Sequence, residues 1–128
     1  MNPIQLNEQY VPHYREDRPW GYFVVVYDAP HTKVKELVVS PGSRLSYQMH
    51  HKRREHWLVV VGEATVTLDD VVHIVKAGES VDVPIGVKHR IANMGTMPLR
   101  LIEIQTGDYF GEDDIVRFSD DYNRADVV

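Results

Sequence analysis

The sequence has no cysteine, no long hydrophobic run and no excess of positive charge. The absence of cysteine excludes disulfide bonds and thiolate metal sites, so a bound metal ion would need nitrogen and oxygen ligands. The longest apolar stretch has about the length of a strand, far below the roughly 20 residues of a membrane-spanning helix. With 14 basic against 19 acidic residues and a net charge of -5, binding to nucleic acid or to an anionic membrane is not expected.

The N-terminal residues 1–14 also lack the basic and apolar regions of a signal peptide, so a cytoplasmic location is expected. A chain of 128 residues is long enough for one sizeable core but not for two. Its hydrophobic content of 43% and charged content of 26% are those of a globular protein. We therefore predict one soluble domain over residues 1–128, with its core at roughly 14–124.

Short segments rich in valine, isoleucine, leucine or tyrosine recur along the chain and are separated by turn residues. This pattern is typical of an all-β sandwich or barrel, and no long segment has a helical period. Asp69 and Asp70 mark the clearest hairpin, because aspartate tolerates tight-turn geometry. From residue 107 onward we expect a closing strand or a short helix. The other expected strands are Gly21–Tyr27, Lys33–Ser40, Leu45–His50, Glu55–Val61, Ala64–Leu68, Val71–Val75, Ser80–Val83, His89–Asn93 and Leu99–Gln105.

The residues with most chemical information begin at Gln48. Side chains alternate between the two faces of a strand, so Gln48 and His50 share one face while His51 lies on the other. Only one histidine of the tandem pair can therefore join Gln48.

A turn over residues 52–54 is expected next, and Glu55 then opens a new strand. Trp57, Val59 and Val61 share the face of Glu55, which suits the interior of a barrel. His56 is expected to face away from this interior.

A second stretch passes through a Pro-x-Gly turn at residues 84–86 to His89, which starts a returning strand and can reach the same interior. Gln48, His50, Glu55 and His89 would then converge on one divalent metal ion. One amide oxygen, two imidazoles and one carboxylate suit Zn, Mn, Co, Ni or Fe, and the sequence does not choose among them.

At these positions the chain resembles the cupins in two motifs. Gln48 replaces the first histidine of the first motif, and the second motif has no departure. The first motif is met by Gly42, Gln48, His50, Glu55 and Gly62, and the second by Gly78, Pro84, Gly86, His89 and Asn93. The resemblance implies a small jelly-roll-like barrel, the double-stranded β-helix.

The run Gln48–Trp57 further resembles the C-terminal isomerase domain of type II mannose-6-phosphate isomerase/mannose-1-phosphate guanylyltransferase. This resemblance spans roughly residues 14–124 and implies a metal-dependent isomerase that interconverts mannose 6-phosphate and fructose 6-phosphate, a step toward GDP-mannose. No glycine-rich nucleotide-binding stretch is present, so guanylyltransferase activity is not expected. The chain would be the isomerase unit standing alone.

The resemblance also places an arginine at position 53, where a guanidinium can bind the sugar phosphate bidentately. Arg53 is therefore the first candidate for substrate binding and catalysis, with Lys52 as a second basic contact. The group that transfers the proton stays open among His56, Glu103 and Lys88, because sequence gives no distances.

Four other interpretations remain open. The four candidate ligands could form a hydrogen-bonded polar cluster without a metal. Alternatively, the domain could keep the metal and bind a sugar or sugar phosphate without catalysing a reaction. An oxygen-activating cupin is disfavoured by Gln48, since such sites usually use three histidines, and a metal-independent sugar-nucleotide epimerase has no use for the ligand set.

Trp20 and Trp57 are expected in the core. A homodimer is expected because cupin barrels often pair through sheet edges.

Overall fold

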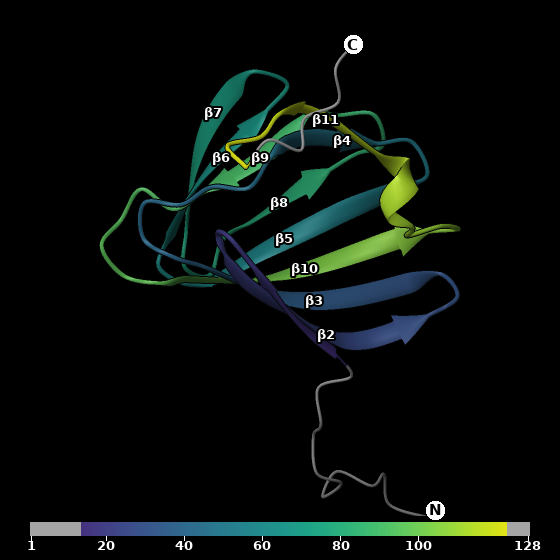
Figure 1. The fold of residues 1–128 in the computed structure, drawn as a ribbon, viewed down its shortest axis with the longest axis horizontal. Helices are drawn as coiled ribbons and strands as arrows, with labels where there is room; N and C mark the ends of the chain where they lie inside the picture. The colour runs from purple at the N-terminus through teal and green to yellow at the C-terminus, as the bar shows by residue number, and fades with distance from the viewer. Residues whose placement is uncertain (1–13, 123–128) are drawn as a thin grey trace, which may run out of the picture.

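The structure is a computed structural model that describes residues 14–122, and it consists of two antiparallel sheets that face each other (Figure 1). The predicted all-β class is confirmed. The larger sheet has the order β1 (Tyr14–Arg18), β2 (Gly21–Ala29), β3 (Thr32–Val39), β10 (Leu99–Gly107), β5 (Arg53–Val61) and β8 (Ser80–Val83). The smaller sheet has the order β11 (Ile115–Ser119), β4 (Tyr47–His50), β9 (His89–Ala92), β6 (Glu63–Leu68) and β7 (Val71–Lys76).

The expected strands are all present, with ends shifted by at most two residues. The segment after residue 107 contains both expected alternatives, a 3-10 turn at Glu112–Asp114 and the closing strand β11. The edge strand β1 was not expected, because Tyr14–Arg18 is mostly charged and has no apolar alternation. Within residues 14–122 no helix is long and apolar enough to cross a membrane. The homodimer stays a prediction.

The β6–β7 hairpin turns at Asp69 and Asp70, as predicted. Both have positive φ, 44° and 69°, which is the backbone geometry of the two-residue turns that match strand twist. Asp69 Oδ1 accepts a hydrogen bond from the Lys88 amide at 2.8 Å, and Tyr47 donates its hydroxyl to Asp70 Oδ1 at 2.8 Å. The turn is therefore fixed to the strands that carry the candidate site.

The apolar core lies between the sheets, and both tryptophans belong to it, as predicted: Trp20 is 5% exposed and Trp57 is 2% exposed. The inward prediction for Val61 is wrong, since its side chain is 46% exposed. Arg100 pairs with Val61 while Leu101 pairs with Val59, so β5 carries one extra residue at this point. Such a bulge reverses which face the following side chain joins.

Gly107 closes β10 against the start of β5, where it pairs with Arg53. Its φ is 150°, and a Cβ there would lie 2.4 Å from the Lys52 carbonyl oxygen. We expect Gly107→Ala to lower the free energy of unfolding by about 3 kcal/mol, from backbone strain and this clash. Urea denaturation measures the change.

Gly78→Ala is the matched control for this substitution, because Gly78 also has positive φ, 86°, but nothing lies within 4 Å of its added Cβ. It should cost about 1 kcal/mol, from the φ angle alone. Equal losses in the two variants would contradict the close approach of β10 to residues 52 and 53.

Candidate metal centre

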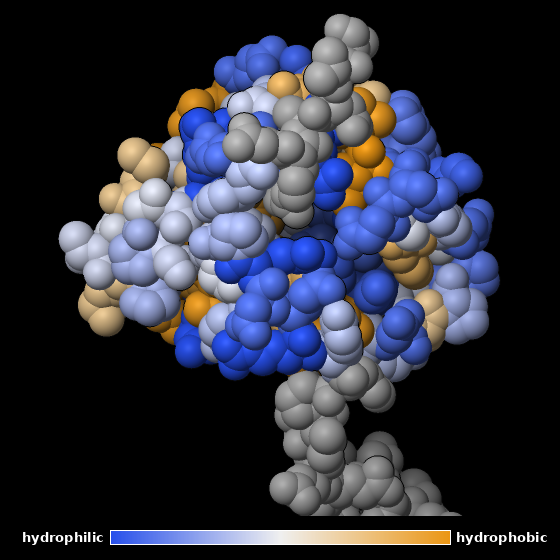
Figure 2. Space-filling model, viewed as in Figure 1, coloured by the Kyte–Doolittle hydropathy of each residue, from blue (hydrophilic) through white to orange (hydrophobic). Residues whose placement is uncertain are grey.

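A cavity of about 670 Å³, including its open mouth, lies between the two sheets. Polar and charged side chains share its wall with apolar ones such as Trp20, Phe23 and Leu37. Figure 2 shows that hydrophilic residues cover much of the face seen in Figure 1, with hydrophobic residues in smaller groups. A partly apolar cavity with a few convergent polar groups is the usual form of a small-molecule site.

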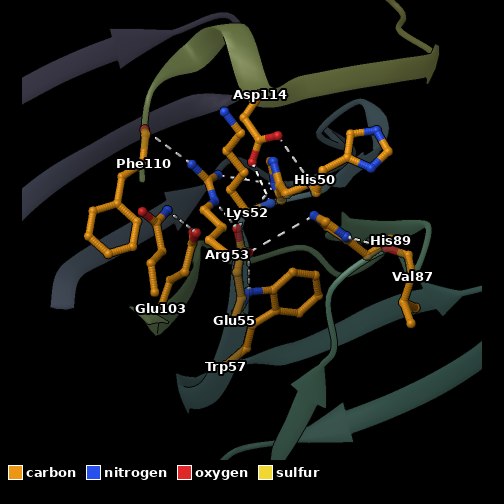
Figure 3. Close-up of polar contacts among 12 residues, drawn as sticks. His50, Lys52, Arg53, Glu55, Trp57, Val87, His89, Glu103, Phe110 and Asp114 are labelled. Atoms are coloured by element: carbon orange, nitrogen blue, oxygen red, sulfur yellow. Dashed lines mark hydrogen bonds and ion pairs between the residues drawn. The ribbon is translucent and has the colours of Figure 1, made fainter. Parts of the chain in front are cut away.

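Three of the predicted ligands meet in this region. His50, Glu55 and His89 offer ligand atoms that all lie within 4.8 Å of one another. His50 Nε2 is 3.2 Å from Glu55 Oε2, and His89 Nε2 is 4.0 Å from Glu55 Oε1. The three side chains are 2%, 4% and 2% exposed. The cluster is compatible with a metal ion, and Figure 3 shows the His89 ring directed toward Glu55.

The three candidate ligands come from both sheets. His50 ends β4 and His89 begins β9 in the smaller sheet, whereas Glu55 lies on β5 in the larger one. Gln48 lines the cavity and pairs in register with His89 across β4 and β9. The structure therefore brings Gln48 beside the cluster, and its place as the fourth ligand stays a prediction.

The histidine hydrogen bonds fit a metal. His89 Nδ1 lies 3.0 Å from the Val87 carbonyl oxygen, to which it can only donate. That tautomer leaves a lone pair on Nε2, and this buried atom has no hydrogen-bond partner among the described residues. A ligating histidine characteristically donates its second ring N–H to a backbone carbonyl, which fixes the ring and its tautomer. A buried, unpartnered Nε2 aimed at a carboxylate is thus what a divalent cation requires.

The electrostatics of the cluster favour the metal-binding forms of Glu55 and His89. Burial alone would raise the pKa of Glu55, but the close contacts with His50 and with the Arg53 guanidinium hold that pKa well below its usual range. Burial lowers the pKa of His89, against the opposing charge of Glu55. A carboxylate and a neutral imidazole are the forms that bind a metal ion.

Arg53 is not part of a solvated turn, which corrects the expected turn over residues 52–54. It is the first residue of β5, is 6% exposed, and shares the inner face of Glu55. Its Nε donates to Glu55 Oε2 at 2.9 Å, its Nη2 lies 3.1 Å from His50 Nε2, and its Nη1 donates to the Phe110 carbonyl at 3.3 Å. The guanidinium therefore orients two of the three ligand residues.

Glu103 lies on the cavity wall and is 7% exposed. It accepts a hydrogen bond from Gln105 Nε2 at 2.6 Å. Burial raises the pKa of Glu103 to about 7, and the charge of Glu55 adds to the effect, against the opposing charges of Lys35 and Arg53. A carboxyl group that titrates near neutrality can both give and take a proton.

The other predicted catalytic residues lie outside the cavity lining. The His56 side chain is 41% exposed and its Nδ1 lies 2.6 Å from Asp82 Oδ1. Lys88 donates from Nζ to Asp70 Oδ2 at 3.1 Å. Lys52 is exposed, and its Nζ lies 4.9 Å from the centroid of the Tyr109 ring. Their functional roles stay predictions that this geometry does not favour.

Two side chains at the site were missed from the sequence. Lys35 on β3 lines the cavity and pairs in register with Glu103 on β10. Trp57, expected only in the core, also donates from Nε1 to Glu55 Oε1 at 2.9 Å. Alternation from Glu55 was the available signal for Trp57, whereas nothing local to residue 35 indicates its partner.

Two antiparallel sheets that enclose a buried histidine–glutamate cluster define this chain as a cupin. A solved protein with a double-stranded β-helix domain from Klebsiella pneumoniae superposes with a TM-score of 0.66 at 22% identity, over 73% of this chain and 80% of that one. The sequence profile described as "Mannose-6-phosphate isomerase C-terminal" matches residues 5–120. The chain belongs to this family.

The chain is also similar to curated proteins. "Mannose-1-phosphate guanylyltransferase 2" of Escherichia coli O157:H7 is 44% identical over 98% of this chain and 26% of its own length. "Alginate biosynthesis protein AlgA" of Pseudomonas aeruginosa is 49% identical over 84% of this chain and 22% of its own length. The chain thus spans about a quarter of the length of these relatives.

Proposed function

We propose that this domain is a metal-dependent aldose–ketose isomerase that interconverts mannose 6-phosphate and fructose 6-phosphate. The observation that carries the proposal is a single cavity whose wall contains the buried ligands Glu55 and His89, the guanidinium of Arg53 and the titratable carboxyl of Glu103. These are the parts that such a reaction needs: a charge-stabilising centre, a substrate-orienting cation and a proton carrier.

The family supports this choice of substrate, since the matching profile carries the name of mannose-6-phosphate isomerase. The curated relative from Escherichia coli is named for a guanylyltransferase, but this chain matches only 26% of that protein's length. We therefore assign the isomerase reaction alone to this domain.

In the reaction one proton moves between C2 and C1 of the open-chain sugar and a second moves between the oxygens on these two carbons, while negative charge develops on those oxygens. A divalent ion held by Gln48, His50, Glu55 and His89 would supply Lewis-acid stabilisation of that charge. We assign to Glu103 the transfer of the carbon-bound proton from one carbon to the other, since it lines the cavity and its pKa of about 7 makes both forms accessible.

Two further side chains prepare the site for this chemistry. Arg53 holds Glu55 and His50 in place with its Nε and Nη2 groups. Trp57 closes one side of the centre, since its ring lies 5.4 Å from that of His89 in an edge-on arrangement. Together they fix the ligand side chains from within the cavity wall.

A coupled assay of the metal-loaded protein tests the proposal by following fructose 6-phosphate formed from mannose 6-phosphate. We expect Arg53→Lys to reduce turnover by about 10- to 100-fold, because lysine cannot contact Glu55, His50 and the Phe110 carbonyl together. Arg54→Lys is the control, since Arg54 is exposed on the neighbouring position of β5.

The absence of turnover in metal-loaded wild-type protein would refute the isomerase. Binding of mannose 6-phosphate without conversion would instead favour the non-catalytic sugar-phosphate module. Equal turnover of Arg53→Lys and Arg54→Lys would remove Arg53 from the site.

A further inference from the structure

Lys35 is a cation in the cavity that the reaction described above does not use. It lies on β3, is partly buried, and lines the cavity wall. Its Nζ is 4.4 Å from the centroid of the Phe23 ring, which also lines the cavity. The ammonium therefore stands against an aromatic face at the edge of the space that a ligand would fill.

The ammonium of Lys35 makes no hydrogen bond or ion pair with any residue between 14 and 122. Other cavity cations are engaged by the protein itself: Arg53 by Glu55, His50 and a carbonyl, and Arg18 by Glu16. A lysine ammonium has three N–H donors, and withdrawing it from water without an acceptor is costly. Burial accordingly lowers the pKa of Lys35, although the charge of Glu103 opposes this change.

The cavity wall as a whole has the opposite charge balance to the chain. Five basic and three acidic side chains line it, whereas the sequence has 14 basic and 19 acidic residues. A concave surface that concentrates positive charge in an acidic protein attracts anions. Lys35 supplies N–H donors to such an anion without breaking a bond inside the protein.

Strand register places Lys35 relative to the rest of the site. Lys35 on β3 pairs with Glu103 on β10, and Glu103 pairs with Trp57 on β5. The Cα atoms of Lys35 and Trp57 are therefore two strand spacings apart, about 10 Å. A ligand that extends from Lys35 to the metal ligand Glu55, two residues from Trp57, has to pass over Glu103.

We propose that Lys35 binds the anionic end of the ligand, so that the cavity selects a phosphorylated sugar over the free sugar. The identity of the sugar rests on the proposed function, whereas the anion site does not. In this arrangement the phosphate lies on the β3 side, the metal ligands lie on the β5 side, and the reacting carbons lie between them beside Glu103. Arg53 then orients the ligand residues and Lys35 takes over the phosphate contact first expected of Arg53.

Isothermal titration calorimetry on metal-free protein tests the anion site apart from catalysis. Inorganic phosphate and mannose 6-phosphate should bind to wild-type protein, and unphosphorylated mannose should bind at least 10-fold more weakly. Lys35→Met should weaken the binding of both phosphates at least 10-fold, and Lys35→Arg should retain most of it. Lys76→Met, at an exposed lysine on β7, should bind like the wild-type protein.

Thermal denaturation separates binding from a structural role. Lys35→Met should have an unchanged or higher Tm, because methionine removes a partly buried charge that has no partner. Undiminished phosphate affinity in Lys35→Met, or no phosphate binding by the wild type, would overturn the proposal. A lowered Tm with undiminished affinity would do the same and would assign Lys35 a structural role.

If Lys35→Met does not fold, an NMR measurement on the wild-type protein tests the proposal instead. Reductive methylation with ¹³C-formaldehyde keeps the lysine charge, and the Lys35 resonance, assigned with Lys35→Arg, should shift on addition of inorganic phosphate while that of Lys76 does not. An unmoved Lys35 resonance overturns the proposal. If phosphate binding depends on Lys35 but the protein shows no isomerase turnover, only the proposed function is refuted. If the protein shows turnover but its phosphate binding does not depend on Lys35, only this inference is refuted.

Discussion

His89→Ala should leave the protein unable to retain a divalent metal and should abolish isomerase turnover. His89 Nε2 is buried, is fixed by the bond of Nδ1 to Val87, and has no partner among the described residues. Losing a residue that only orients a ligand typically costs 10- to 100-fold in metal affinity, so losing the ligand itself should cost roughly 1,000-fold or more. Elemental analysis after dialysis against the chosen metal should fall from about one ion per chain to almost none.

The control for this substitution is His51→Ala. His51 is exposed and does not belong to the buried cluster, so His51→Ala should keep both metal and turnover. Metal should also raise the Tm of the wild type and of His51→Ala by mass action, but not that of His89→Ala. Retention of a full equivalent of metal by His89→Ala would show that the ion binds elsewhere.

Glu103→Gln should lower kcat by about 100- to 10,000-fold, the usual contribution of a positioned acid–base group. Glutamine keeps the size of the side chain and an oxygen that can accept the hydrogen bond from Gln105, but it cannot carry a proton. Metal content should stay at the wild-type level, which distinguishes this loss from that of a ligand variant. Glu63→Gln, at an exposed position on β6, should be fully active, and a fully active Glu103→Gln would transfer the proton-carrying role to another residue.

The same substitution should change how stability depends on pH. The pKa of Glu103 is about 7 in the folded protein, against an ordinary value of 4.5. Below pH 4.5 both the folded and the unfolded state are protonated. Between pH 4.5 and 7 the unfolded state loses its proton while the folded state keeps it, so the free energy of unfolding falls as pH rises.

Glu103→Gln removes this loss of stability. Relative to wild type, its free energy of unfolding in metal-free protein should therefore be higher at pH 8 than at pH 4, by up to about 3 kcal/mol. Urea denaturation at the two pH values measures the difference. A difference that does not change with pH would contradict a raised pKa at Glu103.

Local patterns were sufficient to predict the buried cluster of His50, Glu55 and His89. Alternation along the strand placed His50 inward, and the Pro-x-Gly turn placed His89 at the start of a returning strand, as the structure confirms. Alternation also separated His56 from Glu55. The same rule, applied backward from Glu55, would have placed Arg53 inward, but three consecutive basic residues favoured a solvated turn.

Local sequence patterns could not predict which strands pair when they lie far apart in the chain. Lys35 reaches the site only because β3 pairs with β10, and a pattern within residues 33–40 does not specify that partner. The outward position of Val61 depends on a bulge opposite Arg100 and Leu101, which the alternation of side chains along β5 does not predict. The charged strand β1 is held by pairing with β2 and not by an apolar face. These features depend on which strands meet, and that information is distributed over the whole chain.

The candidate metal centre joins the two sheets, because each sheet supplies part of the cluster. Because His50 and His89 belong to one sheet and Glu55 to the other, a relative sliding of the sheets by about 1 Å would change the distances among their candidate ligand atoms. Close-packed interiors transmit such displacements. We therefore expect substitutions in the distant apolar core to change the affinity for a metal ion without touching His50, Glu55 or His89.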